Sequence, residues 1–166
     1  KDYFKPYIFS ANKNYSLICK QIKKYKPRFF LINNKEVYIK VRNKFKKSKT
    51  IILENLEIKK IKKKSDITVF AVPGIAGLPQ TILMIKKSKK MLLANKESII
   101  CGWDIINKIS LKNNTKIIAI DSEHFSISKL LKNSNPSSIK KVYLTASGGP
   151  FLRYKTKKLK TIKPHE

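Results

Sequence analysis

Short apolar runs of the β type alternate along this chain with segments whose apolar residues recur at helical spacing. The apolar runs predict strands at residues 7–10, 29–32, 51–53, 68–72, 91–94, 116–120 and 141–145. Helical spacing covers residues 16–25, 35–46, a stretch that begins at residues 77–79, and residues 96–109. Strands that alternate with helices in this order are typical of an α/β fold, so we expect a largely parallel sheet with flanking helices.

The same periodicity predicts which side chains face the core and where ligands bind. In the helical segment 96–109 we expect Ile99, Trp103 and Ile106 to point inward. Ligands of parallel sheets bind at the carboxyl ends of the strands. Polar residues that directly follow a predicted strand are therefore the candidate functional residues.

A first polar cluster, Asn95-Lys96-Glu97-Ser98, follows the predicted strand at residues 91–94. Asn95 is placed to cap the next helix, whose first turn offers free N–H groups to an anion. Lys96 adds a positive charge at that point. An ordinary capped helix would have the same sequence, so this cluster indicates a site only in combination with others.

A second cluster, Asp121-Ser122-Glu123-His124, follows the strand at residues 116–120. If this stretch is extended, Asp121 and Glu123 point to the same face and repel each other. A hard cation such as Mg²⁺ or Mn²⁺, which takes oxygen ligands, relieves that repulsion. The alternative is a solvated acidic turn, but the chain has only 10 acidic residues and two of them lie here.

A third cluster, Ser147-Gly148-Gly149, follows the predicted strand at residues 141–145. Paired glycines allow the backbone to approach an anion closely, and the Ser147 hydroxyl can donate a hydrogen bond. A flexible turn is the alternative for this short motif.

The formal net charge of +28 raises nucleic-acid binding as an alternative function. The excess is nearly all lysine, and the lysines are spread along the whole chain, whereas arginine is the better reader of phosphates and bases. The clearest basic and aromatic patch lies at residues 23–30. Apolar periodicity already explains its aromatic residues as core, so we favour a solvated lysine surface and expect no specific nucleic-acid partner.

Neither a membrane span nor a disulfide is expected. No apolar run reaches the length of roughly 18 residues that a transmembrane helix needs. Cys19 and Cys101 lie far apart and in no metal or redox spacing, so they are expected as reduced thiols.

Five segments of the chain, in this order, resemble the signature segments of the 1-deoxy-D-xylulose 5-phosphate reductoisomerase family. They are Ala-Asn-Lys-Asn at 11–14, Gly-Ile-Ala-Gly-Leu at 74–78, Leu-Ala-Asn-Lys-Glu-Ser at 93–98, Asp-Ser-Glu-His at 121–124, and Ser-Gly-Gly-Pro-Phe at 147–151. Each segment alone is modest evidence, whereas five in the family's order are specific. The resemblance covers essentially the whole chain.

The resemblance implies an NADPH site. Lys13 and Asn14 correspond to the positions that bind the 2′-phosphate end of the cofactor, together with Asn12, which stands where the family has glycine. Asn95 and Glu97 correspond to further contacts with the cofactor.

It also implies a substrate and metal site. Lys96, Ser122, Glu123 and Ser147 correspond to residues that bind the sugar phosphate substrate. Asp121 and Glu123 correspond to ligands of Mg²⁺, Mn²⁺ or Co²⁺. Lys96, Asp121 and Glu123 are therefore the expected catalytic residues.

The family converts 1-deoxy-D-xylulose 5-phosphate to 2-C-methyl-D-erythritol 4-phosphate for isoprenoid synthesis, by a metal-assisted rearrangement of the carbon skeleton followed by reduction with NADPH. The resemblance implies a Rossmann-like NADPH-binding domain at residues 1–120 and the start of an α+β catalytic domain at residues 121–166. It further implies a homodimer at full length and a location in the bacterial cytoplasm, with a plastid-type organelle as the alternative.

Family members are roughly twice as long as this chain, in line with two or three domains. We expect the opening strand with its Gly-rich turn and a third carboxylate ligand to lie outside these residues, which alone would not turn over substrate. Two other interpretations stay open, an inactive NADPH-binding fragment and a different NADPH-dependent oxidoreductase that shares only the first domain. The clusters at residues 121–123 and 147–151 argue against the latter.

Overall fold

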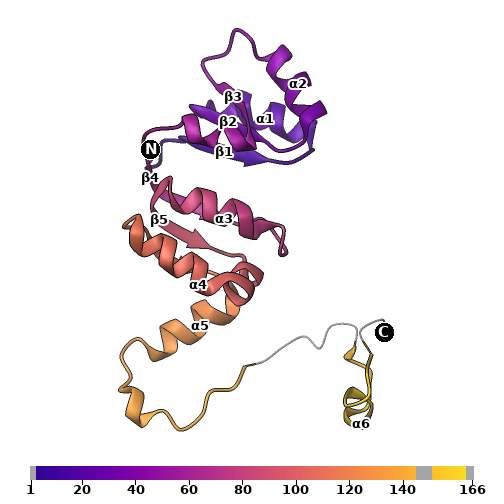
Figure 1. Ribbon diagram of the computed structural model, residues 1–166, viewed down its shortest axis with the longest axis vertical. Helices are drawn as coiled ribbons and strands as arrows, with labels where there is room; N and C mark the ends of the chain where they lie inside the picture. Colours follow the sequence, from indigo (N-terminus) through magenta and orange to yellow (C-terminus); the bar gives the residue numbers. More distant parts are fainter. Residues whose placement is uncertain (1–2, 145–150, 164–166) are drawn as a thin grey trace. The chain divides into compact units, whose positions relative to one another are not determined.

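The computed structural model describes residues 3–144 and 151–163 of the chain, which divides into two compact units, Lys1–Asp121 and Ser122–Glu166. The strands are β1 (Ile8–Ala11), β2 (Phe29–Ile32), β3 (Ile51–Glu54), β4 (Ser65–Phe70), β5 (Ser88–Leu93) and β6 (Lys116–Ala119) (Figure 1). The α-helices are α1 (Tyr15–Tyr25), α2 (Lys35–Lys44), α3 (Gly77–Ile85), α4 (Lys96–Lys112), α5 (Ser122–Leu131) and α6 (Thr156–Leu159). Two 3₁₀ helices complete the described elements, η1 (Asn55–Lys60) and η2 (Pro136–Ser138).

The six strands of the described residues all lie in the first unit and pair in parallel. They form two three-stranded sheets, a first sheet in the order β1-β2-β3 and a second sheet in the order β4-β5-β6. Parallel neighbours joined through helices confirm the predicted α/β, Rossmann-like fold. The described residues contain two such sheets where the sequence predicted one.

The first sheet is covered on both faces. Successive residues of β2 point to opposite faces, so Phe30 and Ile32 pack among residues of α1 and α2 while Leu31 packs against Ile58 and Ile61. Phe30 and Ile32 are 0% exposed, and burying each such side chain contributes roughly 1.5–3 kcal/mol. A strand that is apolar on both faces is what a parallel sheet requires.

The second sheet is covered by α3 and α4 on the face that carries Met91 and Leu93 of β5. Both side chains are 0% exposed and pack with Ile85 of α3 and Ile106 of α4. The two helices also pack against one another. This core holds the carboxyl end of β5 in place, where the first polar cluster begins.

The inward orientation predicted for Trp103 is wrong. Ile106 is fully buried as expected, but Trp103 is 47% exposed. The backbone at Gly102 is not helical (φ −140°, ψ 19°), so α4 is kinked there. The buried face still runs through Gly102, from Ser98 to Ile106 at four-residue spacing, and Trp103 lies next to that face.

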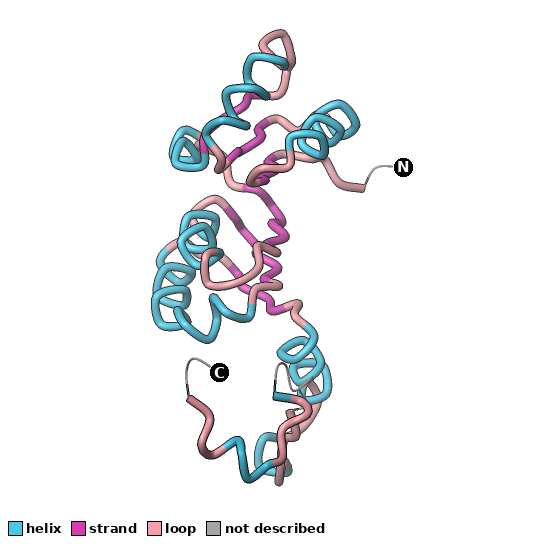
Figure 2. The backbone as a smooth tube through the Cα atoms, turned by 90° about the vertical axis from the view of Figure 1, so that its right-hand side faces the viewer, coloured by secondary structure: helices cyan, strands magenta, loops and turns pink. Residues whose placement is uncertain are grey.

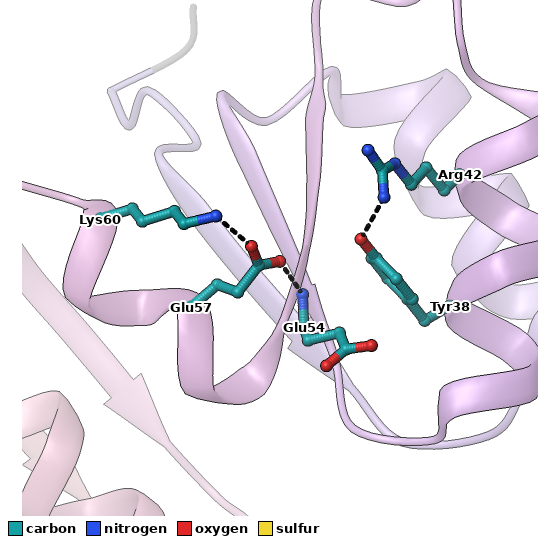
Figure 3. Close-up of polar contacts among 5 residues, drawn as sticks. All are labelled: Tyr38, Arg42, Glu54, Glu57 and Lys60. Carbon is teal, nitrogen blue, oxygen red and sulfur yellow. Dashed lines mark hydrogen bonds and ion pairs between the residues drawn. The ribbon is translucent and has the colours of Figure 1, made fainter.

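A polar contact closes the junction between β3 and η1, as Figure 3 shows. The carboxylate of Glu57 accepts a hydrogen bond from the Glu54 backbone N–H at 2.9 Å and pairs with the Lys60 ammonium. The Lys60 contact, followed by the backbone hydrogen bond, lowers the pKa of Glu57 below its ordinary value. On α2, the Arg42 guanidinium donates to the Tyr38 hydroxyl at 2.9 Å.

The second unit contains helices and loops and, within its described residues, no strand (Figure 2). The strand predicted at residues 141–145 is therefore wrong for residues 141–144, where Tyr143 is 79% exposed; Thr145 lies outside the described residues. A strand is stable only when a neighbouring strand takes up its backbone hydrogen bonds, and this unit offers none in its described part.

The expectations about membrane-spanning helices and about the two cysteines can be compared with the fold. Across residues 3–144 and 151–163, no helix combines the length and the apolar character that crossing a bilayer requires. Cys19 and Cys101 are free thiols, the first buried and the second exposed.

Candidate cofactor and metal site

The turn after β1 presents the predicted 2′-phosphate residues at the start of α1. The Asn14 side chain caps the helix, its Oδ1 accepting a hydrogen bond from the Leu17 N–H at 3.0 Å. Lys13 is exposed beside it, and α1 has no acidic residue in its first turn. Asn12 has no positive φ, so asparagine is accommodated where the family has glycine. This turn is chemically suited to a phosphate.

The turn after β2, which the sequence analysis did not single out, lies beside the turn after β1. Ala11 and Ile32 are aligned in the first sheet, and the Asn33 N–H donates to the Ala11 carbonyl oxygen at 3.1 Å. Asn34 caps α2 by accepting from the Val37 N–H at 2.9 Å, and Lys35 is exposed next to it. The signal was present in the sequence, because Asn-Asn-Lys follows the strand at residues 29–32 much as Asn-Lys-Asn follows the first strand.

The turn after β4 is built on two glycines. Gly74 has φ +72°, a left-handed conformation that favours glycine. At Gly77, an added Cβ would lie 2.8 Å from the Val72 carbonyl oxygen and 3.0 Å from Nδ2 of Asn95. Only glycine therefore lets this turn approach the next one so closely.

The turn after β5 carries Asn95, which is 2% exposed. Its Oδ1 accepts from the Ser98 N–H at 2.6 Å, which makes it the predicted cap of α4. Its Nδ2 donates to the Val72 carbonyl oxygen and, at 2.8 Å, to that of Gly74. One buried side chain thus joins two strand-to-helix turns.

The second sheet brings this turn next to Asp121. Leu93 and Ala119 are aligned on the parallel strands β5 and β6, and Asn95 and Asp121 each lie two residues further on. Lys96 is partly buried at the start of α4, and Asp121 is 8% exposed. The carboxyl edge of the second sheet therefore gathers an amide, a lysine and a carboxylate, as strand order predicted.

The extended conformation assumed for residues 121–123 is wrong. Helix α5 begins at Ser122, so Glu123 lies in its first turn, where the Ser122 hydroxyl is 2.8 Å from the Glu123 carboxylate. Residues two apart in a helix do not share a face, so strand geometry no longer supports convergence of Asp121 and Glu123. Their joint binding of a metal remains a prediction that rests on the resemblance.

Other parts of the predicted site lie outside what the second sheet assembles. Ser147 falls outside the described residues, and Asn12, Lys13 and Asn14 lie in the turn after β1 of the first sheet. Among the residues that the structure describes, no three His, Cys, Asp or Glu side chains form a potential metal-binding group.

Two family models match consecutive parts of the chain. Residues 1–102 match the model for 1-deoxy-D-xylulose 5-phosphate reductoisomerase, and residues 117–166 match the model for the C-terminal domain of the same enzyme. The chain belongs to the 1-deoxy-D-xylulose 5-phosphate reductoisomerase family.

Curated members of the reductoisomerase family align along nearly the whole chain. The enzyme of Pelagibacter ubique is 37% identical over 96% of this chain and 42% of its own length. The enzyme of Buchnera aphidicola is 37% identical over 98% of this chain and 45% of its own length. The chain thus spans less than half the length of the curated relatives it matches.

Solved reductoisomerase structures share the fold. The Zymomonas mobilis enzyme in complex with NADPH superposes with a TM-score of 0.77 at 24% identity, covering 98% of this chain and 43% of its own. A reductoisomerase in complex with NADPH, fosmidomycin and magnesium superposes with a TM-score of 0.76 at 26% identity, covering 97% of this chain and 43% of its own.

Proposed function

We propose that this chain is the cofactor-binding part, with the start of the catalytic part, of a 1-deoxy-D-xylulose 5-phosphate reductoisomerase. Supporting this are the matches to both family models and the gathering of Asn95, Lys96 and Asp121 at one sheet edge. The product of the whole enzyme would be 2-C-methyl-D-erythritol 4-phosphate, made with NADPH and a divalent metal ion. The homodimer and the bacterial cytoplasm belong to the same proposal and rest on the family.

The residues present are chemically suited to NADPH. Lys13 and the positive end of the α1 dipole would hold the 2′-phosphate, since both favour an anion and no acidic residue in the first turn opposes them. Glu97 and the backbone at the start of α4 would hold the remainder of the cofactor. The chemistry supplied by bound NADPH is hydride transfer, for which the protein contributes position and charge.

The residues also suit a hard metal ion in part. Asp121 is a nearly buried carboxylate, and carboxylate oxygens are ligands that Mg²⁺ and Mn²⁺ prefer. Glu123 would be the second ligand, with Ser122 and Lys96 orienting the sugar phosphate and Ser147 completing its binding. The chemistry supplied by the metal is polarisation of a carbonyl oxygen. In this assignment, residues 1–120 would form the domain that binds the cofactor, and residues 121–166 would begin the domain that binds the metal and the substrate.

The nucleic-acid alternative has less support in the structure. Of the aromatic residues in the basic patch at residues 23–30, Phe30 is fully buried, and Tyr25 is 44% exposed with the Lys24 ammonium 5.2 Å from its ring. A stacking platform needs several exposed rings on one face.

The decisive test is the affinity of the chain for NADPH compared with NADH, measured by isothermal titration. Lys13→Ala should weaken NADPH binding about tenfold, because one charge-assisted hydrogen bond to the 2′-phosphate is worth about 1.5 kcal/mol, and leave NADH unchanged.

Lys20→Ala is the matched control, because it removes an equal charge from an exposed position further along α1. Equal losses in both variants, or no preference of the unmodified chain for NADPH, would contradict the proposed cofactor site. Tight, saturable binding of a nucleic acid at physiological salt would favour the alternative.

A further inference from the structure

The buried amide of Asn95 is committed to the protein itself. A primary amide has two N–H donors, and Nδ2 of Asn95 donates to two carbonyl oxygens, those of Val72 and Gly74. Its Oδ1 accepts from the Ser98 N–H. At 2% exposure, this side chain has no N–H left for a cofactor.

Around Asn95 a ring of residues is joined by polar contacts, and we call this ring the turn clamp. Its members are Val72, Gly74, Gly77, Thr81, Asn95 and Ser98. The Thr81 hydroxyl donates to the Gly77 carbonyl oxygen at 3.0 Å and lies 3.5 Å from the Ser98 hydroxyl. Thr81 and Ser98 are both 0% exposed. The clamp therefore ties the turn after β4 to the first turn of α4 by buried polar contacts on two sides.

We infer that Asn95 is a positioning residue, whose side chain sets the separation between the turn after β4 and the first turn of α4. Because Lys96 and Glu97 occupy that first turn, the clamp fixes where they meet cofactor and substrate, a role that rests on the proposed function. Any contact of Asn95 with NADPH would be made by its backbone. A shift of about 1 Å in such a positioning element is enough to weaken a site substantially.

Substitution by aspartate separates this role from simple helix capping. Aspartate is as good an N-cap as asparagine and keeps the acceptor for the Ser98 N–H. It replaces the two N–H donors by an oxygen that faces the Val72 and Gly74 carbonyl oxygens, so the clamp opens. Asn95→Ser is the milder variant, since serine also caps but neither donates to both carbonyls nor adds charge.

Thr115→Val is the matched control for stability. The Thr115 hydroxyl is buried and bonds the carbonyl oxygens of Ile85 and Ser88, each at 2.8 Å. It precedes β6, at the end of the second sheet opposite to the clamp. The variant therefore loses a comparable buried hydrogen bond without touching the proposed site.

The experiment measures NADPH affinity and amide hydrogen exchange in the 166-residue chain at a temperature where every variant is folded. Asn95→Asp and Asn95→Ser should bind NADPH at least tenfold more weakly than Thr115→Val, and the Gly77 N–H should exchange at least tenfold faster than in that control. Unchanged affinity in both Asn95 variants, at stability matched to Thr115→Val, would overturn the inference. If the unmodified chain does not bind NADPH, the proposed function fails, and exchange at Gly77 alone then decides whether Asn95 sets this turn.

Discussion

Two asparagines of this chain occupy the same place in the local sequence and differ in their surroundings. Asn14 and Asn95 each follow a parallel strand, precede a helix and adjoin a lysine, and each accepts a hydrogen bond from the backbone N–H three residues on. Asn14 is exposed, and its side chain makes that cap contact within its own helix. Asn95 is 2% exposed and adds two donated bonds to another turn.

The difference arises in the neighbouring turn, not in the asparagine. The turn after β4 can reach Asn95 because Gly74 adopts a left-handed conformation and Gly77 has no Cβ to strike the Val72 carbonyl. In the turn after β2, which is bonded to Ala11 at the end of β1, Asn34 caps its own helix α2. A capping asparagine therefore becomes a tertiary connector only where a glycine turn is packed against it.

Replacing Gly77 should have the largest effect on stability. In Gly77→Ala the new Cβ would lie 2.8 Å from a backbone oxygen and 3.0 Å from the Asn95 amide, so backbone or clamp must move. Overpacking of this kind typically costs 1–3 kcal/mol, and we expect a loss of about 3 kcal/mol in the free energy of unfolding. Urea unfolding followed by the fluorescence of Trp103, the single tryptophan and a residue of α4, measures it.

Gly74→Ala provides the internal control for that measurement. Its Cβ would meet nothing within 4 Å, so the cost is only that of a left-handed alanine, about 1 kcal/mol. If the two alanine variants lose the same stability, close approach at Gly77 is not what holds the turns together.

The sequence was informative wherever the signal is local. Apolar runs located each of the six described strands, and a polar residue after an apolar run located Asn95 as the cap of α4. The extra bonds of Asn95 were not predictable, because their acceptors lie 21 and 23 residues earlier in the chain and depend on how two turns pack.

The failures have the same origin. Trp103 is exposed because the buried face of α4 passes through Ser98 and Gly102, which an apolar pattern does not mark, and Trp103 lies beside that face. Glu123 was placed on an extended segment because strand and helix starts cannot be told apart over three residues. The division into two sheets is a property of long-range pairing that no local pattern contains.

Removing the cap at Asn14 should have a smaller effect than disturbing the clamp. Asn14→Ala leaves the Leu17 N–H without its side-chain acceptor, which typically costs about 1 kcal/mol. Asn14→Asp keeps the acceptor and adds a negative charge at the start of α1, so its stability should equal or exceed that of the unmodified chain. Thermal unfolding followed by circular dichroism compares the three. A cost for Asn14→Asp similar to that of Asn14→Ala would mean that Asn14 donates a hydrogen bond as Asn95 does.

The smallest expected effect concerns the ionised contact between Glu57 and Lys60 in η1, just after β3. The pKa of Glu57 is lowered, first by the Lys60 ammonium and then by the Glu54 N–H, so ionised Glu57 stabilises the fold above its ordinary pKa and this contribution is lost as pH falls through the lowered value. Because Lys60 is 68% exposed, the pair is screened by solvent, and we expect Glu57→Gln to cost about 0.5 kcal/mol at pH 7 and less at pH 3. The difference between the two chains in urea unfolding at each pH isolates Glu57 from other carboxylates. The turn clamp contains no charged side chain, so the loss of unfolding free energy in Asn95→Ser should be the same at both pH values. A pH-dependent loss in Asn95→Ser, or a constant loss in Glu57→Gln, would contradict this distinction between an uncharged buried contact and a charged surface contact.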